Sequence, residues 1–422
     1  MRDPAVQSII AVVNTLTPQQ SLEFFVPMLS RLANGDLFTS RVSACALMYL
    51  AYQTLPVGQV SDPVKTELRN AFSMLCADET PMVRRAACSH LGAFATTVEA
   101  KYAHAGVLET FRQLAVDEQD SVRLLAVEGC ASLVKVLFKE NPSGALEKMG
   151  PVIVTLCQDK SWRVRYMVAT KFCELMEGHI NADETKVAEI VDEFLRLLRD
   201  EEAEVRTAAA YKVAGVAELV GNVQTMNSLV PAMRVMVKDE CHYTRAALAS
   251  VIMSVCPICS KQDVFEHLLP LFLHLLKDKH PEVRLNVIAR LDVLSDVVGL
   301  ELLSQSLLPA ITELATDHKW RVRLAISGHL PSLARQLGSE FYDTKLDELT
   351  TTWLGDSVFS VRKAAAENVV RLVEVFGKEW AVAKAIPKVG TLASNQCCLY
   401  RLTAIYAMVG LANQLGMEGI NA

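Results

Sequence analysis

Cysteine is the residue type in this chain that could most readily support chemistry, through a redox dithiol or a metal site. Cys256 and Cys259 have the spacing of a redox pair, but they fall inside an apolar helical pattern with no strand–helix–strand unit around them. Cys397 and Cys398 are adjacent, and no Cys or His pair lies at zinc-finger spacing from them. We therefore interpret these cysteines as ordinary packing or turn residues and predict no metal site.

Other signatures of catalysis and cofactor binding are missing from the sequence. There is no glycine-rich nucleotide loop, no HExxH zinc motif and no GxSxG nucleophile motif. His242, His280 and His318 recur at regular intervals in what look like equivalent turns, where we expect solvated side chains. Glu201 and Glu202 form a carboxylate pair typical of solvated charge in a turn. We predict that the chain is not an enzyme and binds no cofactor.

The composition indicates helices packed on helices. The chain has 422 residues, more than one hydrophobic core usually organises, so several domains or a repeat array are needed. Hydrophobic residues make up 51 % but aromatic residues only 6 %, so leucine, valine and alanine supply most of the apolar mass. The 19 glycines and 15 prolines leave few places for tight turns between strands. This pattern argues against a β-rich fold.

Charge and cysteine usage indicate the class of partner and the compartment. The formal net charge is −6 with both signs interspersed, so neither nucleic acid nor a membrane is an expected partner. Eleven cysteines, several inside apolar runs, are typical of reduced thiols in an intracellular protein. No apolar run reaches the roughly 18 residues of a membrane span, and the first residues lack a signal-peptide pattern. We expect a soluble cytoplasmic or nuclear protein.

An aspartate followed six residues later by an arginine recurs along nearly the whole chain. The arginine column is Arg41, Arg84, Arg123, Arg165, Arg206, Arg245, Arg284, Arg323, Arg362 and Arg401. The aspartate column is Asp78, Asp117, Asp159, Asp200, Asp239, Asp278, Asp317 and Asp356, with Gly35 and Asn395 in its place at the two ends. From Arg206 to Arg401 the separation between successive arginines is constant, which identifies a tandem repeat.

Each column has a structural role in a helical hairpin. An amphipathic helix precedes the aspartate, as from His267 to Lys277, and a second helix follows the arginine. The aspartate lies in the turn, where its carboxylate can accept free N–H groups near the start of the second helix. We expect the arginine to bridge to the aspartate of a neighbouring repeat. Repeated along the chain, these bridges would form a ladder.

Two-helix repeats with a period of about 39 residues and no strand are typical of HEAT arrays. We predict an all-α fold, an α-solenoid or superhelix of tandem HEAT repeats curved into an arch. Residues 1–422 would form a single solenoid, with the second helix of an incomplete repeat in 1–20 and ten repeats in 21–422. Both ends resemble interior repeats rather than polar caps, so we expect a piece of a longer array.

One column of the turns has no common chemistry. Three residues before each arginine the chain carries Phe38, Pro81, Asp120, Trp162, Ala203, His242, Pro281, Trp320, Phe359 and Cys398. Because a framework position would repeat itself, this column is predicted to face a partner or solvent. Large apolar groups such as Trp162 and Trp320, with arginine beside them, are typical of binding hot spots. The alternative is that each ring folds onto the neighbouring turn and only caps the stack.

Longer strings around the turns resemble one HEAT family in particular, the A-type scaffold subunits of protein phosphatase 2A. These strings include TPMVRRAA from Thr80, DEQDSVRLLAVE from Asp117, DKSWRVRYMVA from Asp159, KWRVRLAI from Lys319 and FGKEWA from Phe376. The resemblance extends from about Arg2 to near Leu415. It implies that the chain corresponds to the second helix of the family's third repeat followed by repeats four to thirteen of fifteen, and that loss of the last two weakens binding of the catalytic subunit.

The resemblance also implies where partners bind. The family's late turns grip the phosphatase catalytic subunit, and the matching residues here are Lys319, Trp320, Arg321, Phe359, Leu399 and Tyr400. Its earlier turns hold B-type regulatory subunits, and the matching residues are Pro81, Met82, Arg85, Asp117, Glu118, Asp120, Ser161, Trp162 and Arg163. We expect Arg84 to act mainly in the ladder and Arg85 to act mainly in contact with a partner.

The predicted function is a scaffold that joins a phosphatase catalytic subunit to a regulatory subunit, which sets substrate specificity; the scaffold would be a monomer within a heterodimer or heterotrimer. The alternative is another HEAT-repeat adaptor such as an importin-like transport receptor. That function would need acidic columns along the second helices, and these columns are apolar or mixed. A HEAT-fold lyase or hydroxylase would need His and carboxylate metal ligands repeated in the turns, and these are missing.

Overall fold

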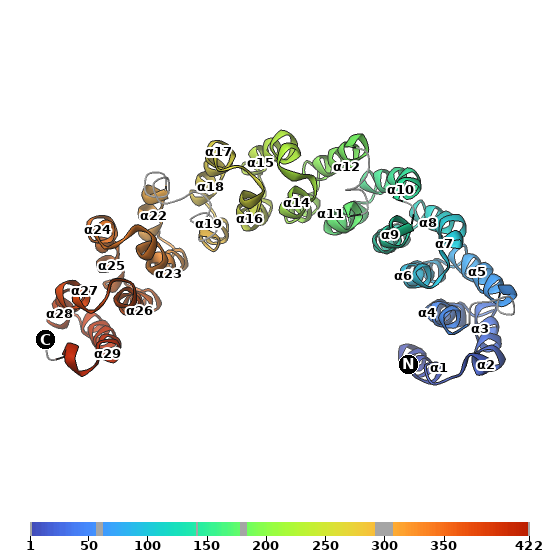
Figure 1. Cartoon of the computed structure of the whole chain (residues 1–422), viewed down its shortest axis with the longest axis horizontal. Coiled ribbons are helices and arrows are strands. Elements are labelled where there is room, and N and C mark those ends of the chain that lie inside the picture. Colours follow the sequence, from blue (N-terminus) through green and yellow to red (C-terminus); the bar gives the residue numbers. More distant parts are fainter. Residues whose placement is uncertain (1, 56–61, 141, 178–183, 292–306, 421–422) are drawn as a thin grey trace. The chain divides into compact units, whose positions relative to one another are not determined.

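The computed structural model describes residues 2–55, 62–140, 142–177, 184–291 and 307–420. Across these residues the chain is helical and contains no strand, which confirms the all-α prediction. The chain divides into two compact units, Met1–Leu229 and Val230–Ala422. Each unit is a series of antiparallel helical hairpins (Figure 1).

The first helices of the hairpins are mostly built from several short segments. In the first unit they are α2 (Pro18–Gln20), η1 (Ser21–Phe25) and α3 (Val26–Ala33); α5 (Asp62–Cys76); α7 (Ala100–Tyr102), η2 (Ala103–Val107) and α8 (Leu108–Ala115); α10 (Pro142–Cys157); α12 (Glu184–Leu197); and η3 (Thr225–Leu229). In the second unit they are α15 (Val230–Met236); α17 (Lys261–Asp263), η5 (Val264–Leu268) and α18 (Leu269–Leu276); α22 (Leu308–Ala315); α24 (Ser339–Phe341), η7 (Tyr342–Leu346) and α25 (Asp347–Leu354); and α27 (Lys378–Trp380), η8 (Ala381–Ala385) and α28 (Ile386–Ala393).

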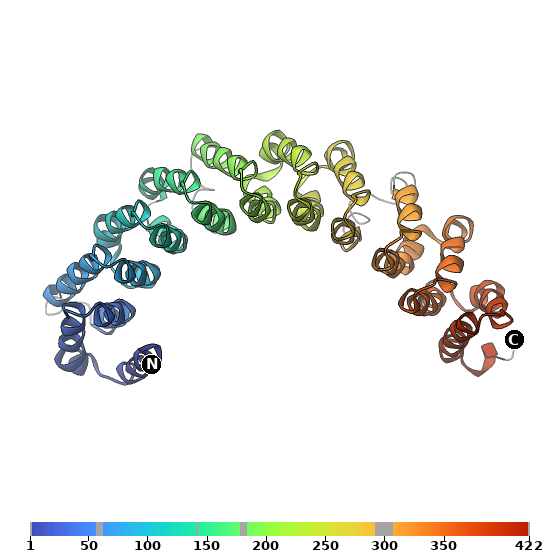
Figure 2. The same ribbon diagram turned by 180° about the vertical axis from the view of Figure 1, so that it is seen from behind.

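The second helices form the other layer of each unit (Figures 1 and 2). In the first unit they are α1 (Arg2–Val13), α4 (Phe38–Thr54), α6 (Pro81–Thr97), α9 (Asp120–Glu140), α11 (Trp162–Met176), α13 (Ala203–Ala210) and α14 (Val213–Gln224). In the second unit they are α16 (His242–Val251) with η4 (Ile252–Ile258), α19 (Pro281–Ile288), α23 (Trp320–Leu337), α26 (Phe359–Phe376) and α29 (Cys398–Ile420).

Packing within each unit runs from one repeat to the next. Helix α6 packs between α4 and α9, and α23 packs between α19 and α26. The residue three positions after each arginine is at most 1 % exposed in every repeat: Ala44, Ala87, Ala126, Val168, Ala209, Leu248, Val287, Ile326, Ala365 and Ala404. Small or slender side chains at this position let neighbouring second helices approach closely, so each hairpin buries its apolar face against its neighbours.

Many first helices contain a widened π turn. The backbone N–H of Val26 bonds to the Ser21 carbonyl five residues back, and Pro27 follows. Because proline lacks an N–H and clashes with the carbonyl four residues earlier, the preceding turn widens. The same order occurs at η5 before Pro270 and at η8 before Pro387. Segments η2 and η7 widen without proline, and nothing in the sequence explains them.

Cys256 and Cys259 lie at the end of a second helix, but not in a continuous α-helix. Residues Ile252–Ile258 form a tighter 3₁₀ segment that contains Pro257, whose missing N–H prevents α-helical bonding there. Burial raises the pKa of the Cys256 thiol to about 12. A redox-active cysteine needs the opposite shift in pKa, so burial disfavours thiolate chemistry at Cys256. Within the described part of the chain, no helix is both long and apolar enough to span a bilayer.

Candidate partner-binding ridge

Each turn between the two helices of a repeat is organised by its aspartate. Asp78 Oδ1 accepts the backbone N–H of Thr80, the residue just before α6, at 2.8 Å. The same bond forms at Asp117, Asp159, Asp200, Asp239, Asp278, Asp317 and Asp356. Asn395 Oδ1 accepts the N–H of Cys397 in the same way. The carboxylate therefore satisfies an N–H group at the start of the second helix, as its position in the sequence indicates.

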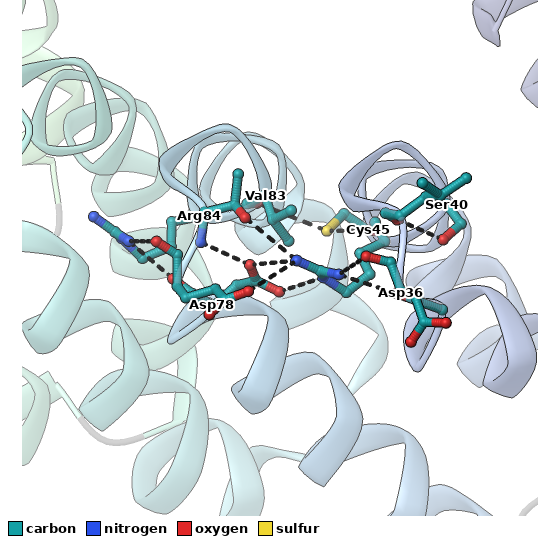
Figure 3. A network of polar contacts seen from close by, with 11 residues as sticks. Asp36, Ser40, Cys45, Asp78, Val83 and Arg84 are labelled. Carbon is teal, nitrogen blue, oxygen red and sulfur yellow. Dashed lines mark hydrogen bonds and ion pairs between the residues drawn. The ribbon is translucent and has the colours of Figure 1, made fainter.

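Each arginine clamps its own turn and the turn of the next repeat. Arg84 Nη1 donates to the Asp78 carbonyl at 2.8 Å, while Arg84 Nε and Nη2 reach the carboxylate of Asp117 at 2.7 and 3.1 Å. Figure 3 shows this network around Asp78 and Arg84. The two-pronged fit of a planar guanidinium to a carboxylate fixes the relative position of adjacent repeats.

This ladder recurs in both units. The remaining rungs of the first unit, each with an Nε–Oδ2 distance of 2.6 or 2.7 Å, are Arg41–Asp78, Arg123–Asp159 and Arg165–Asp200. Those of the second unit are Arg245–Asp278 and Arg323–Asp356 at 2.6 Å, and Arg284–Asp317 through Nη2 at 2.8 Å. Arg206 Nη1 donates to the carbonyls of Asp200 and Glu201 in its own turn.

Burial and hydrogen bonding shift the pKa of the ladder carboxylates in opposite directions. The side chains of Arg245 and Asp278 are each 6 % exposed. Burial by itself would raise the pKa of Asp278, but the hydrogen bonds from Arg245 and from the His280 N–H outweigh burial and lower the pKa. The same balance lowers the pKa of Asp78 and Asp356. These aspartates are therefore charged structural groups.

The ladder is interrupted at Arg362. Its side chain is buried and its Nη1 donates to the Asp356 and Ser357 carbonyls, but its Nε has no hydrogen-bond partner. The next position of the aspartate column holds Asn395, which offers an amide where the other turns offer a carboxylate. The Asn395 side chain has a single acceptor oxygen, which already accepts the Cys397 N–H. The Arg362 guanidinium therefore has no carboxylate across this step of the ladder and lies over the Phe359 ring at 5.9 Å.

The irregular column has one structural position in common. All ten of its residues, from Phe38 to Cys398, are the first residue of a second helix. We call the surface formed by these residues and the turn residues around them the turn ridge. Because the ladder holds the turns in register, the turn ridge presents different side chains at regular intervals within each unit.

The residues matched to regulatory-subunit binding begin at the start of α6. Pro81 is half-buried, whereas Met82 is 52 % exposed. Met82 and Arg85 line a cavity of about 530 Å³ together with Val42 of α4 and Val6 of α1. Arg85 therefore faces the second-helix layer and takes no part in the ladder, which uses Arg84.

The acidic residues of the next turn divide between two roles. Asp117 is held by Arg84, so it belongs to the ladder and offers little to a partner. Glu118 is 74 % exposed and lies 3.2 Å from Arg84 Nη2. Asp120 Oδ2 accepts a hydrogen bond from the Ser161 hydroxyl at 3.1 Å, which links two neighbouring turns. Glu118 is therefore the acidic side chain here that is most open to a partner.

Two turns carry the same Trp–Arg pair, one in each unit. The guanidinium of Arg163 lies 5.1 Å from the Trp162 ring, and that of Arg321 lies 4.9 Å from the Trp320 ring. Both arginines are exposed and both tryptophans are half-buried, as is usual for a cation over an aromatic face at a surface. Lys319, just before Trp320, is exposed as well.

The last residues matched to catalytic-subunit binding are Phe359, Leu399 and Tyr400, and their surroundings differ. Phe359 and Leu399 are 47 % and 46 % exposed. Tyr400 is half-buried, and its hydroxyl donates to the Gly355 carbonyl at 3.0 Å. Tyr400 ring atoms would lie 2.9 Å from a side chain added at Gly355, so the tyrosine also packs the turn.

An apolar stripe on α29 was not recognised in the sequence. Leu402, Ile405, Tyr406 and Val409 are between 40 % and 58 % exposed, and the Tyr406 ring lies 6.2 Å from that of Phe359. Their i, i+3, i+4, i+7 spacing was the signal that could have revealed the stripe. At the positions equivalent to Leu402 and Tyr406, helix α26 carries Lys363 and Glu367, which form an exposed ion pair 3.9 Å apart.

The described residues contain no group of three or more His, Cys, Asp or Glu side chains arranged to hold a metal ion. His242 and His280, expected to be solvated, stack face to face with ring centroids 4.2 Å apart and thus join two neighbouring turns.

The tandem hairpins, the capping aspartates and the ladder define an α-solenoid of HEAT repeats. A HEAT-repeat model matches residues 149–179, and a model described as a PPP2R1A-like HEAT repeat matches residues 183–259. A PIK3R4-like middle-domain model matches residues 250–351. Parts of the chain are therefore similar in sequence to the A-type regulatory subunits of protein phosphatase 2A, and the HEAT-repeat architecture is shared.

Several curated relatives match segments of the chain. A probable PP2A regulatory subunit of Caenorhabditis elegans is 44 % identical over 147 residues, 35 % of this chain and 24 % of that protein. The A-type PP2A regulatory subunit of Schizosaccharomyces pombe is 41 % identical over 176 residues, 42 % of this chain and 29 % of that protein. The beta isoform of the human 65 kDa A-type regulatory subunit is 48 % identical over 99 residues, 24 % of this chain and 16 % of that protein. The matched segments thus span less than a third of each relative.

Solved structures with the same architecture are distant in sequence. Importin beta matches with a TM-score of 0.66 and 13 % identity, covering 98 % of this chain and 54 % of that one. Kap121p bound to Ulp1p matches with a TM-score of 0.65 and 15 % identity, covering 96 % of this chain and 43 % of that one. These similarities show the helical solenoid fold alone.

Proposed function

We propose that this protein is a scaffold that joins a B-type regulatory subunit to a serine/threonine phosphatase catalytic subunit. The observation that carries the proposal is the turn ridge, whose residues differ from turn to turn on a repeated framework. It is supported by A-type regulatory subunits that are 44 % and 41 % identical to segments of 147 and 176 residues. The chain supplies binding surfaces, and the phosphatase chemistry belongs to the partner.

The turns of the second unit are assigned to the catalytic subunit. Lys319, Trp320 and Arg321 form a basic, aromatic cluster at the start of α23, and Phe359 and Leu399 are large apolar groups at the next two turns. Burying a tryptophan and two apolar side chains under a partner is typical of a binding hot spot. Tyr400 would contribute mainly by fixing the last turn through Gly355.

The turns of the first unit are assigned to the regulatory subunit. Met82 and Arg85 offer an apolar and a cationic group, Glu118 offers an exposed carboxylate, and Trp162 with Arg163 offers a second Trp–Arg pair. Asp120 and Ser161 bind each other and hold two of these turns together. The mixture of charges suits a polar interface with complementary charges on the partner.

Joining two proteins on one scaffold raises their effective concentration near each other. A substrate held by the regulatory subunit would therefore meet the catalytic subunit far more often than in free solution. Substrate choice would follow from which regulatory subunit occupies the first unit.

An importin-like transport receptor is the second candidate. The similarity to importin beta and Kap121p shows only the fold, and the matched sequence relatives are phosphatase subunits. Binding of basic cargo along the second helices would require acidic columns there, whereas the equivalent positions carry residues such as Arg85, Tyr166 and Leu324.

The two Trp–Arg turns allow a matched test. The wild-type chain, Trp320→Ala and Trp162→Ala are each titrated with purified PP2A catalytic subunit or, separately, with a B-type regulatory subunit. We expect Trp320→Ala to weaken binding of the catalytic subunit by about 2 kcal/mol, roughly thirtyfold in Kd, and to leave the regulatory subunit unaffected. Trp162→Ala should do the reverse.

Because both tryptophans begin a second helix and have an arginine over the ring, each variant controls for the other. Failure of the wild-type chain to bind either subunit would refute the scaffold proposal. Equal weakening of both partners by both variants would refute the assignment of the two units.

A further inference from the structure

The same groove occurs in both units, between two successive turns on the ladder edge. In the first unit it has a volume of about 320 Å³ and is lined by Ala115, Val116, Asp117, Glu118, Arg123, Thr155, Gln158, Asp159 and Lys160. In the second unit it has about 400 Å³ and is lined by Val237, Lys238, Asp239, Glu240, Arg245, His274, Lys277, Asp278 and Lys279. Each lining residue of the first groove has a counterpart in the second groove at the same position of the repeat. The repeat framework therefore builds the groove, and side-chain differences set its chemistry.

Three lining positions change from neutral to basic between the two grooves. Val116, Thr155 and Gln158 of the first groove correspond to Lys238, His274 and Lys277 of the second. All three basic residues are solvent-accessible, and Lys279 keeps the basic character of Lys160. We call the second groove, defined by Lys238, His274, Lys277 and Lys279, the basic groove.

The carboxylates at the base of the basic groove do not neutralise these lysines. Asp278 is bound by Arg245 through two short hydrogen bonds of 2.6 and 3.0 Å. Lys277 forms an ion pair with Glu313 at 3.0 Å, but both side chains are about 60 % exposed, and such a pair is weak in water. The third carboxylate of the lining, Asp239, is half-buried and accepts the Cys241 N–H. Glu240 is the exposed carboxylate of the lining, so Lys238, Lys277 and Lys279 outnumber it on the rim.

We propose that the basic groove binds an acidic segment of a partner protein, with Asp or Glu carboxylates lying between Lys238, Lys277 and Lys279. This surface lies apart from the residues assigned to either phosphatase partner, so it is independent of the proposed function. The groove is large enough for one or two carboxylate side chains, and the His274 imidazole at its wall adds a hydrogen-bonding group. Opposite charge across a rim mainly accelerates association and makes binding salt-dependent.

A protein segment fits the basic groove better than a nucleic acid. No aromatic ring of Phe, Tyr or Trp lines the groove to stack on a base. Glu240 at the rim would repel a continuous run of phosphates, and the chain as a whole carries a net charge of −6. Discrete carboxylates can avoid Glu240, whereas a polynucleotide backbone cannot.

The test uses a fluorescein-labelled hexaglutamate peptide and the full chain, with binding followed by fluorescence anisotropy at two salt concentrations. The variant Lys238→Val/Lys277→Gln gives the second groove the lining of the first at two positions. We expect its Kd to rise roughly fivefold, and the wild-type affinity to fall with added salt. Circular dichroism checks that the variant stays folded, which the exposure of both side chains favours.

A control variant, Lys261→Gln/Lys345→Gln, removes the same charge from exposed positions elsewhere in the second unit. The proposal requires that this control bind hexaglutamate as tightly as the wild type. Equal loss in both variants, or unchanged binding in Lys238→Val/Lys277→Gln, would overturn it. So would a single-stranded oligonucleotide that competed through the same lysines at equal affinity.

Discussion

The ladder aspartates make stability depend on acid. The pKa of Asp78, Asp278 and Asp356 is lowered in the folded chain, so each favours folding when charged. This contribution is complete above the unfolded pKa of about 3.9 and is lost as the pH falls through the lowered folded values. We predict a steep decline of the urea midpoint below about pH 4, beyond any smaller decline below about pH 6.5 from His90, whose pKa burial lowers. The variant Asp278→Asn should show a shallower acid decline, and an identical profile would contradict this explanation.

The interrupted rung at Arg362 predicts a stabilising substitution. Asn395→Asp would restore the carboxylate that the other turns present to the arginine of the preceding repeat, here the buried Arg362. We expect an increase of about 1–2 kcal/mol in the free energy of unfolding, measured by urea denaturation. Gln396→Glu changes the charge by the same amount at the neighbouring exposed residue and should have little effect.

Individual residues show where sequence reasoning succeeds. The partners of Arg84 could be predicted because the Asp and Arg columns repeat, and a repeated position implies a repeated contact. The stacking of His242 on His280 could not be predicted in this way. It depends on the ring orientations of two particular turns and is not part of the repeated pattern. The roles of Asp120 and Tyr400 also depend on neighbours 41 and 45 residues away, which the spacing alone does not reveal.

At the scale of the element, glycine ends several second helices. Gly338 and Gly377 follow α23 and α26 with φ of 83° and 90°, a conformation that side chains disfavour. Gly221 and Gly416 have the same positive φ, and these four positions recur in step with the repeat. The sequence contains these glycines at spacings that fit the repeat. They do not stand out as a repeated position, because other second helices end without a glycine.

Gly377, which has a positive φ, and Gly390, which lies inside a helix, should respond in opposite ways to substitution by alanine. Gly377→Ala should destabilise by about 1–3 kcal/mol through backbone strain alone, since an added side chain meets nothing within 4 Å. Gly390→Ala, inside α28 and equally open, should stabilise by about 0.5–1 kcal/mol, because alanine favours a helix. Thermal and urea denaturation of both variants measures the difference. Equal destabilisation by both would show that space, rather than φ, controls these positions.

At the scale of the whole molecule, contacts link each repeat mainly to its neighbours within a unit. Asp278→Ala would leave Arg245 buried without its partner, at a cost of about 3–5 kcal/mol. We expect hydrogen–deuterium exchange to rise in α16, α18 and α19 and to stay unchanged in α4 and α6. Asp78→Ala is the matched variant of the first unit and should leave α23 and α26 protected. Loss of protection throughout the chain in either variant would show that it folds as one cooperative block.

The nearest-neighbour ladder also has a mechanical consequence. Each rung joins only adjacent repeats, so the rungs bear tension in series and the weakest one opens first. Repeats would detach in succession at similar, low forces, each releasing about 39 residues of chain, roughly 130 Å when extended. A molecule built in this way would lengthen under load in steps of similar size.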